Sequence, residues 1–351
     1  MTLSERNLEA VADHGGSLGR ARALFPHAPE PFVDLSTGIN PHPYPLFELP
    51  ATALTRLPEP ARTRELAAVA GRAYGAPSAA YIALAPGTQI LLPRVYSLVR
   101  PGRALILGPT YAEHRRAAAL AGHDAAETVD FDALAEADLA IVVNPNNPDG
   151  RVVSRAKLLD LAKALRAKGG LLVVDEAFMD VGPREESLAG DVGEGGVVVL
   201  RSFGKFFGLA GVRLGFAIAS ENLALRLEAE FGPWAVAGPA LEYGLRALGD
   251  IRWQDAMRGK LDREAARLDA LFGTFSIRVN GGTSLFRLFS LSDAPGLFET
   301  LGRRGIILRN FAERPADLRT GLPGSEEEWL RLEEGLAVWA EAGTARAGAS
   351  R

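Results

Sequence analysis

The segment Leu171-Leu172-Val173-Val174-Asp175-Glu176-Ala177-Phe178 joins an unbroken aliphatic run to an abrupt acidic turn. Such a run is typical of a strand that is buried on both faces of a parallel sheet. Further β-branched or aliphatic runs lie between glycine and proline breaks, at 104–107, 139–143, 197–200 and 214–219. The sequence therefore predicts a mostly parallel central sheet, with Asp175 at the carboxyl end of one strand.

Helical patterns separate several of these strands. Residues 154–168 carry apolar side chains at helical spacing, with Ser154 as the expected N-cap and Gly169 and Gly170 as the stop. Strands that alternate with helices indicate an α/β fold with right-handed crossovers. Because ligands bind such sheets beyond the carboxyl ends of their strands, we expect the functional residues there.

The pattern changes after about residue 234. One long helix is expected over 239–272, followed by short strands over 276–279 and 284–289 and a last helix that begins at Ser325. These features indicate a second, smaller α+β domain. The predicted organisation is an N-terminal arm and substrate-loop segment (1–40), a large domain (41–234), a small C-terminal domain (235–342) and a tail (343–351).

The composition excludes several classes of function. The net charge of the 351 residues is -4 and no basic stripe is present, so neither nucleic acid nor a lipid surface is an expected partner. The absence of cysteine excludes disulfides, thiolate nucleophiles and Cys-bound zinc, and the five histidines show no ligand spacing. We therefore expect no bound metal. No apolar run has the length of a membrane span or a signal peptide, so we expect a cytoplasmic protein.

Four segments carry the residues of a candidate site. Ala85-Pro86-Gly87-Thr88-Gln89 is a glycine turn that opens a helix, where backbone N–H groups attract anions. Asn144–Gly150 and Asp175–Phe178 each follow a strand. Ser202-Phe203-Gly204-Lys205 places a lysine in a glycine-rich, apolar loop, although lysines are normally solvated. Taken singly, each segment is also explained by a cap, a turn, an ion pair or a surface loop.

The order of the four segments resembles the fold-type I enzymes that use pyridoxal 5'-phosphate (PLP), specifically the aminotransferase class I/II group. The resemblance covers about 34–322. It implies a large domain with a mostly parallel sheet and a PLP cofactor held as a Schiff base on Lys205. Asp175 then corresponds to the partner of the pyridine nitrogen, Asn147 to the donor to the phenolic oxygen, and Tyr111 to the aromatic that stacks on the ring.

The same resemblance assigns the remaining site residues. The cofactor-binding positions beyond those four are Gly87, Thr88, Gln89, Ser202 and Arg213. In the small domain, Arg309 and Arg319 match arginines that bind substrate carboxylate or phosphate. The family also implies a homodimer. Members often have Tyr before a proline at the position of Leu57, where it reaches the partner's cofactor phosphate, so that contact is in doubt here.

Two subfamilies compete within this group. One contains the threonine-O-3-phosphate decarboxylases of cobalamin synthesis, which make (R)-1-amino-2-propanol phosphate, and the other the histidinol-phosphate aminotransferases. The decarboxylase is favoured by His14-Gly15-Gly16-Ser17-Leu18, by Leu35–Pro41 and by Phe178 in place of the usual Tyr. A small phosphorylated amino acid is then the expected substrate. The substrate-binding residues would be His14, Gly15, Gly38, Ile39, Asn40, Asn147, Arg309 and Arg319.

Two rival functions from other classes are disfavoured by the sequence. Gly15–Gly19 matches the Gly-x-Ser-x-Gly turn of serine hydrolases, which would make Ser17 a nucleophile if a strand preceded it. A non-catalytic role, as in transcription regulators with aminotransferase-like domains, would require an added DNA-binding module, for which the sequence leaves no residues.

Overall fold

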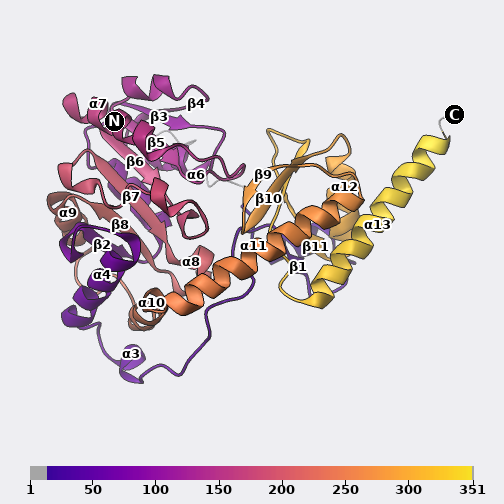
Figure 1. Cartoon of the computed structure of the whole chain (residues 1–351), viewed down its shortest axis with the longest axis horizontal. Coiled ribbons are helices and arrows are strands. Elements are labelled where there is room, and N and C mark those ends of the chain that lie inside the picture. Colours follow the sequence, from indigo (N-terminus) through magenta and orange to yellow (C-terminus); the bar gives the residue numbers. More distant parts are fainter. Residues whose placement is uncertain (1–13, 350–351) are drawn as a thin grey trace. The chain divides into compact units, whose positions relative to one another are not determined.

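The computed structural model describes residues 14–349, and their side chains as far as residue 343. The chain forms two compact units, which are described separately below. Among the described residues, unit 1 contains Pro43–Asp255, and unit 2 contains 14–42 together with the residues from Ala256 onward (Figure 1). Within the described part of the chain, no helix has the length and apolar character needed to cross a membrane. No cluster of three or more potential metal ligands occurs there either.

Unit 1 is built on a seven-stranded sheet. Strand β8 runs antiparallel to both of its neighbours, and the other adjacent pairs are parallel. This arrangement confirms the predicted α/β class with a mostly parallel sheet. In sheet order the strands are β2 (Ile82–Ala85), β8 (Gly215–Ala219), β7 (Val197–Ser202), β6 (Leu171–Asp175), β5 (Leu139–Val143), β3 (Arg103–Leu107) and β4 (Asp124–Thr128).

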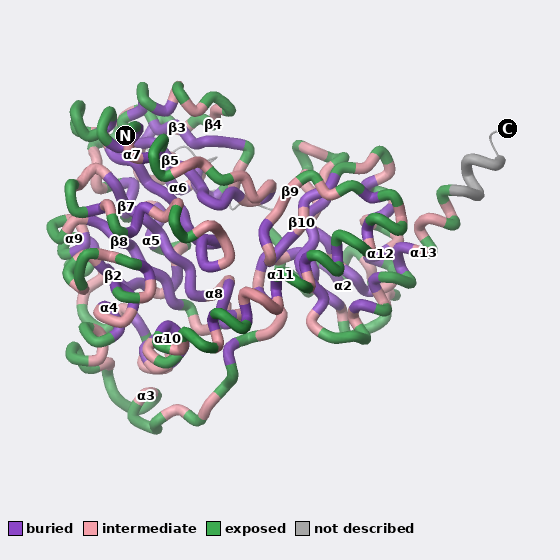
Figure 2. The backbone as a smooth tube through the Cα atoms, viewed as in Figure 1, coloured by how far each residue is buried: buried purple, intermediate pink, exposed green. Residues whose placement is uncertain are grey.

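Helices cover the sheet of unit 1, and the central strands are buried along their whole length, as the tube in Figure 2 shows. This burial explains the unbroken aliphatic runs, because each strand faces apolar side chains on both sides. The helices of unit 1 are α3 (Thr52–Thr55), α4 (Pro60–Tyr74), α5 (Thr88–Tyr96), α6 (Glu113–Leu120), α7 (Arg155–Ala167), α8 (Phe203–Phe206), α9 (Glu221–Phe231) and α10 (Gly238–Gly249).

The single long helix predicted over 239–272 is wrong, because the chain breaks at Asp250 between α10 and α11 (Ile251–Thr274). Asp250 has non-helical backbone angles, and its Oδ1 accepts a hydrogen bond from the backbone N–H of Trp253, 3.0 Å away. Helix α10 packs against α4, so unit 1 continues to Asp255 and extends past the boundary expected at residue 234.

Unit 2 combines a four-stranded antiparallel sheet with a short parallel pair. The sheet order is β12 (Arg309–Asn310), β13 (Asp317–Thr320), β10 (Phe286–Ser290) and β9 (Val279–Thr283). The parallel pair is β1 (Val33–Asp34) with β11 (Ile306–Ile307). Helices α2 (Leu18–Leu24), α12 (Ala294–Arg303), α13 (Glu326–Ala349) and the later part of α11 complete the unit.

Of the segment predicted as an N-terminal arm (1–40), residues 14–40 lie in unit 2, where β1 pairs with β11, and residues 1–13 lie outside the described part of the chain. The strand expected at 276–279 begins only at Val279, since Ser276 has a left-handed backbone (φ 56°) that interrupts an extended chain. Helix α13 runs into the segment expected to be a frayed tail. Its start follows the expected pattern: the Ser325 Oγ accepts from the N–H of Glu328, whose carboxylate accepts from the N–H of Gly324.

Candidate active site

The predicted cofactor residues of unit 1 gather at one edge of its sheet. Strands β5, β6 and β7 are parallel neighbours, and the register pairs Val143 with Asp175 and Asp175 with Leu200. Asp175 ends β6 and Ser202 ends β7, while Asn144 follows β5. Because these strands are parallel, their polar carboxyl ends lie together, which is where α/β sheets bind ligands.

An anion cradle forms where α5 begins. Gly87 precedes the helix with φ 89° and ψ 158°, a conformation open essentially to glycine alone. A Cβ built on Gly87 would lie 2.5 Å from Nη2 of Arg213, and one built on Gly215 would lie 2.6 Å from the amide nitrogen of Thr88. The guanidinium therefore sits against the helix N-terminus, in a space that a side chain would fill. Backbone donors and a cation at one point suit a phosphate group.

Lys205 lies on the short helix α8, two residues after the buried Phe203. Its Nζ is 5.5 Å from the centre of the Phe178 ring. Gly204 allows α8 to pack closely, because a Cβ there would lie 2.9 Å from Cα of Ala210. The half-buried amine thus faces an aromatic ring that carries no hydroxyl, which is the departure from the family pattern noted in the sequence.

Asp175 is held from two sides. Its Oδ1 accepts a hydrogen bond from the backbone N–H of Ala177 (3.0 Å), and its Oδ2 lies 3.1 Å from Nε2 of His114. His114 is fully buried, and its Nδ1 is 2.6 Å from the hydroxyl of Tyr96. A buried carboxylate in this position can receive a proton-bearing ring nitrogen, as the pyridinium of PLP requires.

The sequence did not single out His114 or Tyr96, because the five histidines show no ligand spacing. His114 is three residues beyond Tyr111, and their rings meet edge to face with centroids 5.7 Å apart. That i, i+3 spacing at the start of α6 was the available signal. Burial and the charge of Asp175 raise the pKa of Tyr96 well above its ordinary value, so the phenol keeps its proton.

The loop after β5 is fixed by its asparagines. Asn144 exchanges hydrogen bonds with the backbone of Val153 (3.0 and 2.8 Å). Asn146 accepts from the Thr110 hydroxyl (2.7 Å) and donates to the Pro109 carbonyl (3.0 Å). Both side chains therefore hold the loop that presents Asn147, and Asn146 also joins it to the loop that carries Tyr111.

Tyr111 and Gln89 also contact one another. The Tyr111 hydroxyl donates to Oε1 of Gln89 over 3.2 Å, and the Gln89 amide donates to the Glu113 carboxylate over 2.8 Å. The structure thus brings the predicted aromatic residue to the start of α5, next to the anion cradle.

A buried charge cluster lies beside the site. The Arg201 guanidinium is 3.0 Å from Glu176 and 2.7 Å from Asp180, and it lies 4.3 Å from the centre of the Tyr74 ring. Glu176 follows Asp175, and Arg201 precedes Ser202, so each charged residue is adjacent to a predicted site residue. The ion pair therefore ties the ends of β6 and β7 together.

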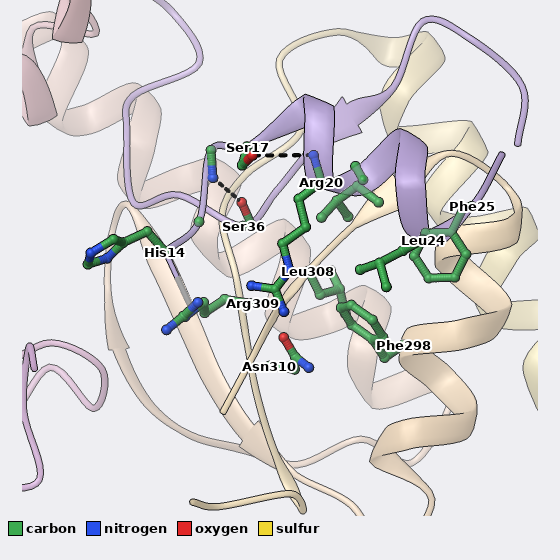
Figure 3. Close-up of a pocket in the computed structure, with 14 residues that line it drawn as sticks. His14, Ser17, Arg20, Leu24, Phe25, Ser36, Phe298, Leu308, Arg309 and Asn310 are labelled. Carbon is green, nitrogen blue, oxygen red and sulfur yellow. Dashed lines mark hydrogen bonds between the residues drawn. The ribbon is translucent and has the colours of Figure 1, made fainter. Parts of the chain in front are cut away.

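Unit 2 contains a pocket of its own, which Figure 3 shows in close-up. Of the predicted substrate residues, it is lined by His14, Gly15 and Arg309, and it also contains Arg20 and Ser36, which the sequence did not single out. The remaining lining residues are Gly16, Ser17, Ala21, Leu24, Phe25, Phe298, Ile307, Leu308 and Asn310. The predicted residues Gly38, Ile39, Asn40 and Arg319 lie outside this lining.

Ser36 organises the glycine loop at this pocket. The Gly16 N–H donates to the Ser36 hydroxyl (2.8 Å), which donates to Asp34 (2.5 Å). A Cβ on Gly15 would lie 2.5 Å from the Ser36 carbonyl oxygen, which also accepts from Nη2 of Arg319 (2.7 Å). Arg319 thus helps to hold the glycine loop in place through the Ser36 carbonyl. Burial and the charge of Arg309 lower the pKa of Arg319 to about 10.

The hydrolase alternative finds no support in this geometry. The Ser17 hydroxyl accepts from the N–H of Arg20 (3.3 Å) and caps α2. The first strand in the described residues, β1, follows Ser17 rather than leading into it. A nucleophile elbow requires the reverse order.

Comparisons with known proteins agree with this architecture. The family model for aminotransferase class I and II matches residues 59–334. Two threonine-phosphate decarboxylases are similar over 94% of this chain and 99% of their own length, at 41% identity in Pseudomonas aeruginosa and 43% in a Sinorhizobium species. A histidinol-phosphate aminotransferase from Sinorhizobium meliloti, solved with pyridoxal-5'-phosphate, has the same fold (TM-score 0.80, 18% identity, 97% of this chain and 98% of that one). The chain belongs to the class I and II aminotransferase family.

Proposed function

We propose that this chain is a PLP-dependent L-threonine-O-3-phosphate decarboxylase, which makes (R)-1-amino-2-propanol phosphate for cobalamin synthesis. The observation that carries the proposal is the near full-length similarity, at 41–43% identity, to two threonine-phosphate decarboxylases. The unit 1 site supports it, because a lysine, a buried carboxylate and an anion cradle occur there together. The unit 2 pocket supports it as well, because His14 and Arg309 both line it.

In unit 1, the cradle of Gly87, Thr88, Ser202 and Arg213 would bind the phosphate of the cofactor. Asp175 would hold the proton on its ring nitrogen, and Asn147 would donate to its phenolic oxygen. Bound in this way, PLP supplies an electron sink for a bond at the substrate's Cα. Phe178 donates no hydrogen bond, so Asn147 carries more of the contact to the phenolic oxygen than in relatives with Tyr.

The choice of bond depends on how the substrate is held. The bond that breaks is the one perpendicular to the conjugated plane, so a decarboxylase must turn the carboxylate out of that plane. His14, Arg309 and Arg319 would bind the substrate phosphate and impose this orientation. Lys205 would hold at Nζ the proton that Cα receives when the carboxylate leaves as CO2.

We propose further that the enzyme is a homodimer in the cytoplasm. Leu46, Leu54 and Leu57 are 74%, 72% and 62% exposed within one short segment of unit 1, an apolar surface that a second copy could cover. Its phosphorylated substrate and cofactor are charged and do not cross membranes, which supports a cytoplasmic location. Size measurement by light scattering tests the dimer.

The decisive experiment gives the holoenzyme L-threonine phosphate in one reaction and histidinol phosphate with 2-oxoglutarate in another. Release of CO2 and aminopropanol phosphate in the first, without glutamate in the second, is the expected result. Glutamate formation without CO2 would instead assign the aminotransferase reaction. Borohydride reduction followed by peptide mass spectrometry should place the cofactor on Lys205, and a label on another lysine would contradict its role.

A further inference from the structure

Three phenylalanines flank Lys205 on helix α8 and directly after it. Phe203, Phe206 and Phe207 are 0%, 1% and 1% exposed. The Phe207 ring stacks on that of Phe203 with centroids 4.6 Å apart, and it meets that of Phe206 edge to face at 5.1 Å. A helix of four residues gains too little from its own backbone hydrogen bonds to be stable alone. The packing of these rings therefore holds α8 in place.

The indole of Trp253 extends this packing to helix α11. It lies edge to face with Phe206, with ring centroids 5.5 Å apart, and it stacks on Phe207 at 5.8 Å. Both arrangements are favourable for aromatic pairs. The backbone N–H of Trp253 donates to Oδ1 of Asp250 over 3.0 Å, which fixes the start of α11. Helix α8 thus packs against a ring whose own backbone is held.

Tyr44 joins the same rings from a distant part of the sequence. Its ring meets Trp253 edge to face with centroids 5.0 Å apart, and its hydroxyl donates to Oδ2 of Asp250 over 3.1 Å. Its backbone N–H donates to the Phe207 carbonyl over 2.8 Å. Tyr44 is therefore bound both to α8 and to the start of α11. These side chains form the α8 aromatic cluster: Tyr44, Phe203, Phe206, Phe207 and Trp253.

The α8 aromatic cluster includes residues close to both ends of unit 1. Among the described residues, unit 1 begins at Pro43 and ends at Asp255. Tyr44 directly follows the first of these residues, and Trp253 closely precedes the second. Both connections that the chain makes to unit 2 are therefore anchored on the helix that carries Lys205.

We propose that Trp253 is a positioning residue for Lys205. The indole holds α8 through Phe206 and Phe207, and α8 in turn keeps Nζ of Lys205 beside the Phe178 ring, 5.5 Å from its centre. A smaller side chain at position 253 would let α8 shift and admit water beside Nζ. Water stabilises the charged form of a nitrogen, so the pH at which this nitrogen loses its proton would rise. The inference rests on the proposed function, in which Lys205 holds PLP.

The test uses the holoenzyme and the variants W253L, W253F, Y44F and W329L. Two quantities are measured: the pH midpoint of the visible absorbance of bound PLP without substrate, and kcat and KM for L-threonine phosphate. W253L should raise the midpoint by about half a pH unit or more and lower kcat about tenfold, with KM little changed. W253F keeps a flat ring at this position and should recover most of both losses.

W329L is the control for a general loss of stability. Trp329 is also a large buried aromatic residue, at 3% exposure, but it lies in unit 2. W329L should weaken the protein in urea unfolding and leave the midpoint at its wild-type value. An equal midpoint shift in W329L, or a wild-type midpoint and kcat in W253L, would overturn the inference.

Y44F decides the matter if W253L does not fold. It removes only the hydroxyl that binds Asp250, the residue that fixes the backbone of Trp253. Its midpoint should rise by a smaller amount, and an unshifted midpoint would overturn the inference. Because the midpoint is measured without substrate, it is independent of the reaction. If the wild type does not decarboxylate threonine phosphate, the proposed function fails, whereas a raised midpoint in W253L would still support the positioning role of Trp253.

Discussion

The imidazole Nε2 of His114 lies 3.1 Å from Oδ2 of Asp175, and both side chains are buried. Nε2 has no aligned hydrogen-bond partner, so the contact is electrostatic rather than an ideal hydrogen bond. On the other side of the ring, Tyr96 keeps its proton and can donate it to Nδ1. Nδ1 is then the acceptor, and Nε2 is the ring nitrogen that carries a proton toward the carboxylate.

This arrangement predicts that His114 positions Asp175. H114A should lower kcat/KM about tenfold or more and weaken PLP binding, because the carboxylate loses the group that orients it. Y96F should have a smaller effect, since the ring stays in place but its tautomer is no longer fixed. Steady-state kinetics and PLP titration measure both. Wild-type PLP affinity and activity in H114A would show that the contact has no role in the site.

The sequence predicted the elements whose signal is local. The aliphatic strands and the residues that follow them were identifiable because a parallel strand buried on both faces needs apolar side chains throughout. His114 was not identifiable in this way, because its contact joins α6 to the end of β6, far apart in the chain. A lone histidine carries no pattern that reveals such a partner.

The helix break at Asp250 was missed for a related reason. The helical spacing continues on both sides, and no glycine or proline occupies position 250 itself. Asp250 is instead fixed by its bond to the Trp253 N–H and by the Tyr44 hydroxyl, which donates to Oδ2 over 3.1 Å. Tertiary contacts override local propensity there. The same holds for the N-terminal segment, whose place in unit 2 depends on the pairing of β1 with β11.

The anion cradle predicts a specific requirement for glycine at position 87. G87A should weaken PLP binding by at least about tenfold, because the new Cβ meets Arg213 and the positive φ is strained by about 1–3 kcal/mol. Spectrophotometric titration of the apoenzyme with PLP measures the effect. G211A is the matched control, since a Cβ there meets no atom within 4 Å and its φ is not in the left-handed range. Similar affinities in the two variants would contradict a close-packed cradle.

Within the Arg201 cluster, loss of the arginine should destabilise the protein more than loss of one carboxylate. R201M should destabilise the protein by about 3–5 kcal/mol, because two carboxylates, Glu176 and Asp180, would remain buried without their cation. E176Q should cost much less, since Arg201 keeps Asp180 and the amide can still accept from the Leu188 N–H. Urea unfolding followed by circular dichroism compares them. Equal losses would show that the two carboxylates do not share Arg201 in this way.

The same cluster predicts how stability changes with pH. Burial raises the pKa of Glu176 above 4.5, against the opposing charge of Arg201. Between 4.5 and the raised value, the folded state binds this proton more tightly than the unfolded state does. The contribution of Glu176 to the free energy of unfolding therefore falls as pH rises through that window and is constant above it.

E176Q removes the titrating group, so it isolates this effect. The free energy of unfolding of E176Q minus that of the wild type should increase as pH rises from 4.5 and then become constant once Glu176 is ionised in both states. Urea unfolding at a series of pH values measures the difference. A difference that decreases with pH would mean that Arg201 outweighs burial and holds the folded-state pKa of Glu176 below its ordinary value.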